Sequence, residues 1–358
     1  KICVIDRFWV CAVTKPPDTQ ENVPLKQSKL QSELAHMLNL LVLFWIGAVS
    51  GFEFPGGLLT NTKPKLSPPE NFVAPTPRPL TITSAKEIPS LLSGAVALGV
   101  RLGSGIAVQG WKPSVSLNDF EEGRYSLSLG PVNLSDESTL ESALNRGIKK
   151  PLILYEYEPS PYCRKVREIL CYLDIPCEFR PTTSKSAFSD ELFERTGRRT
   201  VPYLIDPNDK TNTAKDGMFE SEDIIDYLLS TYGDGTTVNF AARGKVAEIT
   251  GTLSTIARGL KGGQRNPDAR PDNTQMIPLT LYGYEGSPFV KPVRETLCSL
   301  ALPHVLIPCA RGSNNRAEQM KLTGKQFQVP YLVDQNTGCD LFESSAIVDY
   351  LLQVYTTK

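Results

Sequence analysis

Histidine is almost missing from this sequence, and its cysteines never form a closely spaced pair. The 358 residues include only His36 and His304, together with eight scattered cysteines and no C-x-x-C arrangement. Zinc sites combine Cys and His ligands at short, regular spacings, so we expect no metal site. The same scatter fits reduced thiols rather than a disulfide framework.

Neither sign of charge is in excess. Lys and Arg number 38 against 39 Asp and Glu, which leaves a formal net charge of −1. Domains that bind nucleic acid normally carry a strong basic excess on one face. We therefore expect no nucleic-acid partner.

Long apolar runs are also scarce. The run from Met37 to Phe52 is interrupted only by Asn39, and it falls short of the roughly 20 residues that a spanning helix needs. Residues 91–102 mix Leu and Val with Gly and Ala, which predicts a helix that packs closely on a neighbour. One interpretation is membrane contact through residues 37–52 or 91–102. The alternative for the first segment is an apolar stretch with no stable role.

A large internal repeat dominates the second half of the chain. Residues 151–176 and 278–303 are identical at 15 of 26 positions, and residues 219–232 and 342–355 at 9 of 14. The repeat indicates duplication of a unit of about 80 residues, the size of a small domain. A weaker similarity, at an offset of 157, aligns Arg101 with Arg258. Either chance or duplication of a preceding helix explains this second similarity.

Each repeat has the pattern of a thioredoxin fold: a βαβ unit, a further helix, a hairpin and a closing helix. The fold class that we expect is α/β, with two tandem thioredoxin-fold domains and extra helices. The first repeat predicts strands 152–157, 177–180, 202–206 and 216–219, and helices 161–173, 188–196 and 221–231. The second predicts strands 279–284, 304–308, 330–334 and 339–342, and helices 288–300, 314–323 and 344–355.

The remaining segments complete the expected organisation. Six prolines fall between Pro64 and Pro79, too many for a helix or a central strand. The expected division is a poorly ordered N-terminal region and linker (1–90), a small-residue helix with an insertion (91–150), domain 1 (151–233), a helical linker (234–277) with a helix over 238–260, and domain 2 (278–358).

A Ser-Pro pair stands at the first strand–helix junction of each repeat. A helix start leaves unpaired backbone N–H groups that favour an anion or a thiolate, although serine and proline are also ordinary helix-start residues. Basic residues, which are unfavourable at a helix start, follow both pairs and indicate an anionic ligand or an acidic partner, with surface solvation as the alternative. They are Arg164, Lys165, Arg167, Lys291 and Arg294.

Three motifs of the first repeat together resemble the N-terminal domain of glutathione transferases and its glutaredoxin relatives. They are Tyr-x-Tyr-Glu-x-Ser-Pro-Tyr-Cys-Arg-Lys-Val-Arg from Tyr155, Val-Pro-Tyr-Leu from Val201, and Phe-Glu-Ser-Glu-Asp-Ile from Phe219. The resemblance covers residues 151–233 and 278–358. Two such domains in one chain are similar to the tandem-domain proteins of plant plastids, which implies a chloroplast location.

The resemblance implies that glutathione is the ligand. Val201-Pro202 matches the family's cis-proline, which turns the preceding backbone outward to pair with glutathione like a strand. Glu220-Ser221 matches an acidic-serine pair that holds the γ-glutamyl carboxylate at a helix start, with a plain helix cap as the alternative. The implied binding residues are Tyr162, Val201, Pro202, Glu220, Ser221, Ser287, Val329, Pro330, Glu343 and Ser344.

The resemblance also implies two catalytic residues. Ser160 stands where glutaredoxins have their nucleophilic cysteine, so dithiol exchange in this domain and cluster ligation are both excluded. In serine-type glutathione transferases a hydroxyl near this position favours the glutathione thiolate. Cys163 matches the second glutaredoxin cysteine, and its basic neighbours predict a lowered thiol pKa; a half-buried structural thiol is the alternative. Val290 replaces it in the second repeat, which favours a structural role for that copy.

Two functions follow from these features. The first is a glutathione-dependent transferase or thiol-redox enzyme in which Ser160 orients the glutathione thiol and Cys163 is an auxiliary thiol. The second is a non-catalytic interaction or scaffold protein with a protein partner. The missing nucleophilic cysteine and the missing helical domain that completes a transferase favour the second function. Retention of the binding motifs favours the first.

Overall fold

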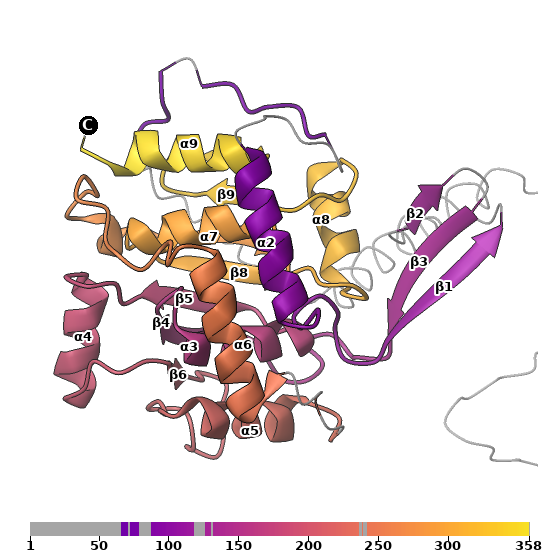
Figure 1. Ribbon diagram of the computed structural model, residues 1–358, viewed down its shortest axis with the longest axis horizontal. Coiled ribbons are helices and arrows are strands. Elements are labelled where there is room, and N and C mark those ends of the chain that lie inside the picture. The colour runs from indigo at the N-terminus through magenta and orange to yellow at the C-terminus, as the bar shows by residue number, and fades with distance from the viewer. Residues whose placement is uncertain are drawn as a thin grey trace, which may run out of the picture. The chain divides into compact units, whose positions relative to one another are not determined.

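The structure is a computed structural model, and it describes residues 66–70, 72–78, 87–117, 126–129, 132–235, 238 and 242–357. The predictions for the apolar run at residues 37–52 and for most of the N-terminal region lie outside these residues. The expected fold class is confirmed: two thioredoxin folds follow one another along the chain (Figure 1).

Domain 1 has its elements close to the expected positions. They are β4 (Leu152–Glu156), α3 (Pro161–Tyr172), β5 (Cys177–Pro181), α4 (Ala187–Thr196), β6 (Tyr203–Ile205) and α5 (Ser221–Tyr232). The predicted strand 216–219 is wrong. Only Met218 pairs there, in an isolated bridge with Leu204, because Gly217 has a φ of 106° that breaks the extended chain.

Domain 2 repeats the same order. Its elements are β7 (Leu279–Gly283), α7 (Val290–Ser299), β8 (His304–Pro308), α8 (Asn315–Thr323), β9 (Tyr331–Asp334), β10 (Cys339–Phe342) and α9 (Ser344–Tyr355). Here the closing hairpin is regular, with β9 and β10 antiparallel.

One continuous sheet runs through both domains. Its seven strands have the order β10-β9-β7-β8-β5-β4-β6. The junction is the antiparallel pairing of β5 with β8, with Cys177 opposite Leu306 and Phe179 opposite His304. The two domains therefore share a hydrogen-bonded sheet, and a single buried hydrophobic cluster includes residues from both.

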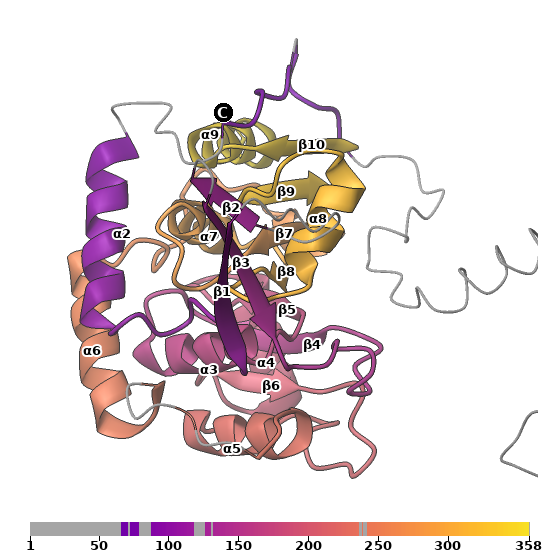
Figure 2. The same ribbon diagram turned by 90° about the vertical axis from the view of Figure 1, so that its right-hand side faces the viewer.

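Two further helices form an outer layer. They are α2 (Ile88–Val100), close to the predicted helix 91–102, and α6 (Gly244–Ala257), within the predicted helix 238–260. Figure 2 shows them side by side, outside the layer that contains α3 and α7. Within the described ranges, no helix is both long and apolar enough to cross a bilayer.

The insertion ahead of domain 1 contains a small sheet that the sequence did not reveal. Strands β1 (Trp111–Leu117), β2 (Ser126–Leu129) and β3 (Val132–Ser138) pair antiparallel in the order β1-β3-β2. β1 contains Pro113, and β3 ends in Ser-Asp-Glu-Ser. Proline and acidic residues are depleted in strands, so these segments lack the composition typical of strands.

Candidate functional site

Ser160 begins α3, as its sequence context predicts. It has extended backbone angles, and its Oγ accepts a hydrogen bond from the Cys163 amide at 3.2 Å. Ser287 has the equivalent relation to the Val290 amide at 3.4 Å. Both serines are almost fully buried, with 8% and 2% of their surface exposed. The role that the structure shows for each hydroxyl is therefore that of a helix cap.

The outer helices pack directly on the two Ser-Pro pairs. At Gly251 of α6, an added Cβ would lie 3.1 Å from the Pro161 Cβ, and at Gly94 of α2, 2.9 Å from the Pro288 Cβ. A Cβ at Gly94 would force a shift, and one at Gly251 would make an unusually tight contact, so glycine favours this close approach at both positions. Thr255 also donates a hydrogen bond to the Pro159 carbonyl. Each outer helix thus covers the start of one domain's first helix.

Four of the five basic residues after the Ser-Pro pairs, all except Lys165, lie in a buried ionic cluster between the domains. Arg167 of domain 1 donates to Glu285 of domain 2 at 3.0 Å, and Arg294 of domain 2 donates to Glu158 of domain 1 at 2.6 Å. Lys291 contacts both carboxylates. Burial alone would raise the pKa of Glu158, but these three cations lower it to about 2. The acidic partner that the sequence indicated is the chain itself.

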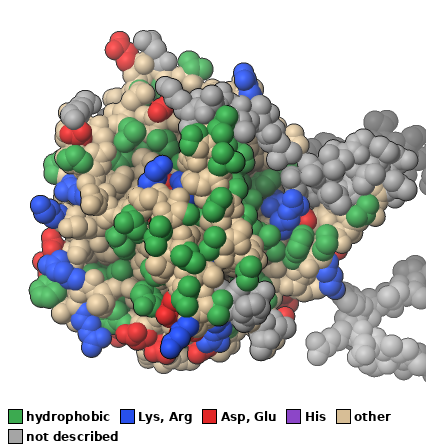
Figure 3. Space-filling view, viewed as in Figure 1, with side chains coloured by type: hydrophobic (Ala, Val, Ile, Leu, Met, Phe, Trp, Pro, Cys, Tyr) green, Lys and Arg blue, Asp and Glu red, His purple; other side chains and the backbone are tan. Residues whose placement is uncertain are grey.

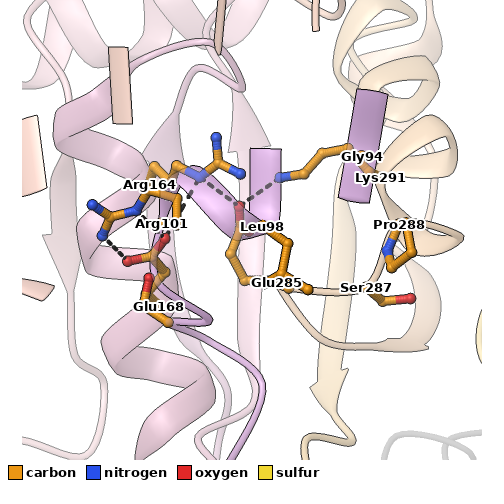
Figure 4. A pocket seen from close by; sticks show the side chains of 11 residues that line it. Gly94, Leu98, Arg101, Arg164, Glu168, Glu285, Ser287, Pro288 and Lys291 are labelled. Carbon is orange, nitrogen blue, oxygen red and sulfur yellow. Dashed lines mark hydrogen bonds and ion pairs between the residues drawn. The ribbon is translucent and has the colours of Figure 1, made fainter. Parts of the chain in front are cut away.

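This cluster leaves little space for a ligand. Figure 4 shows the cavity beside Pro288, where Arg164 and Lys291 converge on Glu285 and Arg101 pairs with Glu168. Its volume is about 10 Å³, and the related cavity beside Pro159 has the same volume. Such a cavity holds at most about one water molecule. A peptide ligand cannot approach the Ser-Pro pairs from the side of the outer helices.

Cys163 is not a reactive thiol. Its side chain is fully buried, and burial raises its pKa to about 12, with the carboxylate of Glu156 as the next contribution in the same direction. The prediction of a lowered pKa is wrong because the cost of burying the thiolate outweighs the lowering by Arg167. Arg164, Lys165 and Arg167 are also all paired with glutamates. The thiol stays protonated at neutral pH, so an auxiliary catalytic role for Cys163 is unsupported.

The two proline motifs have the backbone that the resemblance implied. Both the Val201-Pro202 and Val329-Pro330 peptide bonds are cis. Val201 and Val329 are half-buried, and each of these motifs leads into the strand that follows it, β6 in domain 1 and β9 in domain 2. Tyr162, on the neighbouring first turn of α3, is 47% exposed.

The acidic-serine pairs begin α5 and α9 with an unusual backbone. Glu220 and Glu343 have left-handed φ values of 64° and 71°, and neither caps its helix with its side chain. A non-glycine residue in this region is uncommon and marks a constrained position. Ser221 and Ser344 follow as the first helical residues.

The two acidic residues nevertheless have different surroundings. Glu220 is exposed, and no described residue donates a hydrogen bond to its carboxylate. Glu343 is 7% exposed and accepts hydrogen bonds from the Arg78 amide and the Gln328 side chain, both at 2.7 Å. The predicted ligand position at Glu343 is thus occupied by the protein, while the one at Glu220 is open.

The segment that reaches Glu343 is part of the Pro-rich linker. The Leu66 amide donates to Asn336, and the ring of Phe72 lies 5.2 Å from that of Tyr350. Figure 1 shows this segment passing over α9. Sequence reasoning missed the roles of Arg78 and Gln328. The replacement of Thr200 by Gln328 before the second cis-proline motif was the available signal.

The helix arrangement and the site together define a class of protein: two fused thioredoxin folds with glutathione-site motifs in each. Residues 154–236 and 281–358 each match the family model of the glutathione S-transferase N-terminal domain. The chain therefore contains two tandem domains of this family and is a glutathione-related thioredoxin-fold protein. Neither the curated proteins nor the solved structures gave a match to the chain.

Proposed function

We propose that this protein binds one molecule of reduced glutathione, in domain 1. The observation that carries the proposal is the difference between the two acidic positions. Glu220 is exposed, whereas Glu343 is bonded to Arg78 and Gln328. In domain 1 the carboxylate of Glu220 pairs with the α-ammonium group of glutathione. The first backbone amides of α5 donate hydrogen bonds to the γ-glutamyl carboxylate of glutathione.

The charges near the start of α5 are compatible with an anionic ligand group. Glu222 lies in the first turn and would repel a carboxylate if it were unpaired. Its Oε1 lies 2.7 Å from Lys165 Nζ and its Oε2 lies 3.3 Å from Arg243 Nε. These two cations offset its charge. Asp223, the other acidic residue of the first turn, is exposed, so the anionic group of the ligand binds at the unpaired N–H groups of the helix start, beside this carboxylate.

The chemistry that this ligand supports is the transferase reaction, in which its thiolate attacks an electrophilic carbon of a second substrate. A C–S bond forms, and the leaving group departs with the electron pair of the bond that breaks. Ser160 Oγ already accepts the Cys163 amide, but a hydroxyl keeps one hydrogen to donate. Donation to the ligand sulfur stabilises the thiolate. Thiol exchange through Cys163 is not part of the proposal because that thiol is buried and protonated.

Calorimetric titration with reduced glutathione tests the proposal on the full chain. We expect one binding site per chain. Glu220→Gln should weaken binding at least tenfold, because a lost charge-assisted hydrogen bond costs about 1.5–3 kcal/mol. The matched variant Glu343→Gln should leave the affinity within about twofold. Absence of binding by the unmodified protein, or equal losses in both variants, would contradict the proposal.

A non-catalytic scaffold is the second candidate, and a specific observation favours it. The outer helices use the Ser-Pro pairs as packing surfaces, with close contacts at Gly94 and Gly251. If no glutathione binds and the protein still folds with the same melting temperature in its presence and absence, the scaffold function replaces the first proposal.

A further inference from the structure

The outer helices expose their large aliphatic side chains. Nine such residues on α2, α6 and the turns that follow them are between 42% and 62% exposed. In the space-filling view, hydrophobic side chains gather along the part of the surface where α2 and α6 lie (Figure 3). We call this surface the aliphatic face. Its residues are Ile88, Leu92, Val96, Leu102, Val246, Ile249, Leu253, Ile256 and Leu260.

The inward faces of the same helices carry small and polar residues instead. The buried residues of α2 are Gly94 and Ala97, and those of α6 are Ala247, Gly251, Ser254 and Thr255. A surface helix of a globular protein normally does the opposite, with its apolar stripe toward the core and its polar residues toward water. The polarity of both helices is therefore reversed, and their outward sides are suited to contact with another apolar surface rather than with water.

The size of the aliphatic face suits a stable protein contact. Full burial of an aliphatic side chain removes about 100 Å² of apolar surface, so nine half-exposed side chains offer on the order of 500 Å². A pair of such faces would bury about 1,000 Å² before the intervening small residues are counted, which reaches the lower limit for a specific interface. The single face of about 500 Å² also lies at the upper end of the size range of apolar patches that monomers expose.

The internal duplication gives the two helices of the aliphatic face equivalent surfaces, so that the face is self-complementary. At the offset of 157, Leu92 of α2 corresponds to Ile249 of α6, and Val96 corresponds to Leu253. Both helices therefore place large aliphatics at equivalent exposed positions. Along α6 the exposed residues have spacings of three and four, from Val246 to Leu260, the spacing of a helix–helix seam.

We propose that the aliphatic face is the interface of a homodimer, in which the α2–α6 layer of one chain packs on the same layer of a second copy. A twofold interface requires a self-complementary surface. An uncharged aliphatic surface meets that requirement without opposing like charges, and α2 contains no charged residue between Ile88 and Val100.

A lipid surface fits the observations less well. Helices that lie on membranes carry Lys and Arg on their polar side and often aromatic residues on their apolar side. The aliphatic face has no aromatic residue. Basic residues are also few: α6 contains only Lys245 between Gly244 and Ala257, and α2 contains none.

Analytical ultracentrifugation of the full chain over a range of concentrations tests the proposal. We expect a species of twice the 39.4 kDa chain mass. Leu92→Glu combined with Leu253→Glu should weaken dimerisation at least 100-fold, because it places a charge in both helices of the interface. Leu322→Glu is the matched control: Leu322 is 54% exposed but lies on α8, so this variant should remain dimeric.

Circular dichroism and a melting curve check that each variant is folded. If the glutamate variants do not fold, Leu92→Ala with Leu253→Ala removes apolar area without adding charge and should still weaken dimerisation at least tenfold. A monomeric unmodified protein overturns the proposal, and so does a dimer that none of these substitutions weakens. Flotation of a monomeric protein with phosphatidylcholine vesicles would overturn it in favour of the lipid surface.

Discussion

At the scale of single residues, Ser160 combines two uses of one hydroxyl. Its oxygen caps α3 by accepting the Cys163 amide, and in the proposed complex its hydrogen is donated to the ligand sulfur. The cap holds the side chain at the helix start, where the partial positive charge of the helix also favours a thiolate. The same geometry recurs at Ser287 of domain 2, the domain in which Glu343 is occupied.

Ser160→Ala should therefore raise the thiol pKa of bound glutathione by about one unit, since one lost charge-assisted hydrogen bond is worth about 1.4 kcal/mol or more. The thiolate absorbance of the complex, followed against pH, measures this shift. Ser287→Ala removes the equivalent cap in domain 2 and should leave the bound thiol unchanged. Equal shifts in the two variants would show that helix capping, rather than the hydroxyl in domain 1, is responsible.

His304 is a second residue with a measurable signature. It lies at the junction of the two domains, opposite Phe179, whose ring is 5.4 Å away. Its side chain is 1% exposed, and burial lowers its pKa from 6.5 to about 4. Between these values the unfolded chain binds a proton that the folded chain does not, so folding becomes less favourable as the pH falls through this range.

We expect His304 to lower the free energy of unfolding by about 2 kcal/mol between pH 6.5 and 5, since one pKa unit corresponds to about 1.36 kcal/mol. Urea unfolding of the unmodified protein and of His304→Gln at several pH values measures this contribution as the difference between the two, because Asp174, whose pKa burial raises to about 7, contributes with the opposite sign in the same range. The lowered pKa of Glu158, about 2, has its effect below about pH 4.5 and does not overlap with this range. An unchanged dependence in the Gln variant would assign it to other groups.

At the scale of elements, α2 and α6 connect the two domains through equivalent contacts. Arg258 of α6 donates to Glu295 of domain 2 at 2.6 and 2.7 Å, and Arg101, which follows α2, pairs with Glu168 of domain 1. Arg258 also donates to the Ser90 carbonyl, which matches the bond from Arg101 to the Ala247 carbonyl. Such correspondence supports duplication rather than chance as the origin of the weaker repeat.

Arg258→Ala should lower the free energy of unfolding by about 3–5 kcal/mol, because it leaves the Glu295 carboxylate buried without its partner. Chemical denaturation measures the change. Arg199→Ala is the control, since Arg199 and Asp190 form an exposed pair that contributes less than about 1 kcal/mol. Replacing both Arg258 and Glu295 by Met should recover much of the loss. A loss no larger than that of the control would contradict a stabilising role for this contact.

At the scale of the whole described chain, duplication has produced two domains with one sheet and one ionic cluster. The β5–β8 junction and the exchanged pairs, Arg167 with Glu285 and Arg294 with Glu158, follow the same approximate twofold relation. The relation fails at the candidate site, where the linker occupies Glu343 and leaves Glu220 exposed. One open site per chain, and a dimer through the aliphatic face, are the consequences that we propose.

The sequence by itself determined the fold and the order of elements. Apolar periodicity, turn residues and the repeated motifs are local signals, so nearly every helix and strand of both thioredoxin folds could be placed from them. It also indicated the cis-prolines and the helix starts. It did not locate β1 to β3, which include Pro113 and a Ser-Asp-Glu-Ser run that are untypical of strands, or the irregular chain near Gly217.

Only the tertiary structure decided which of the motif residues are open to a ligand. Burial raised the pKa of Cys163. Pairing between residues more than 100 positions apart placed Arg167 in an ion pair with Glu285 and filled the position at Glu343. The physical reason is that a pKa and an exposed surface depend on all neighbouring groups in space, whereas a motif records only neighbours along the chain.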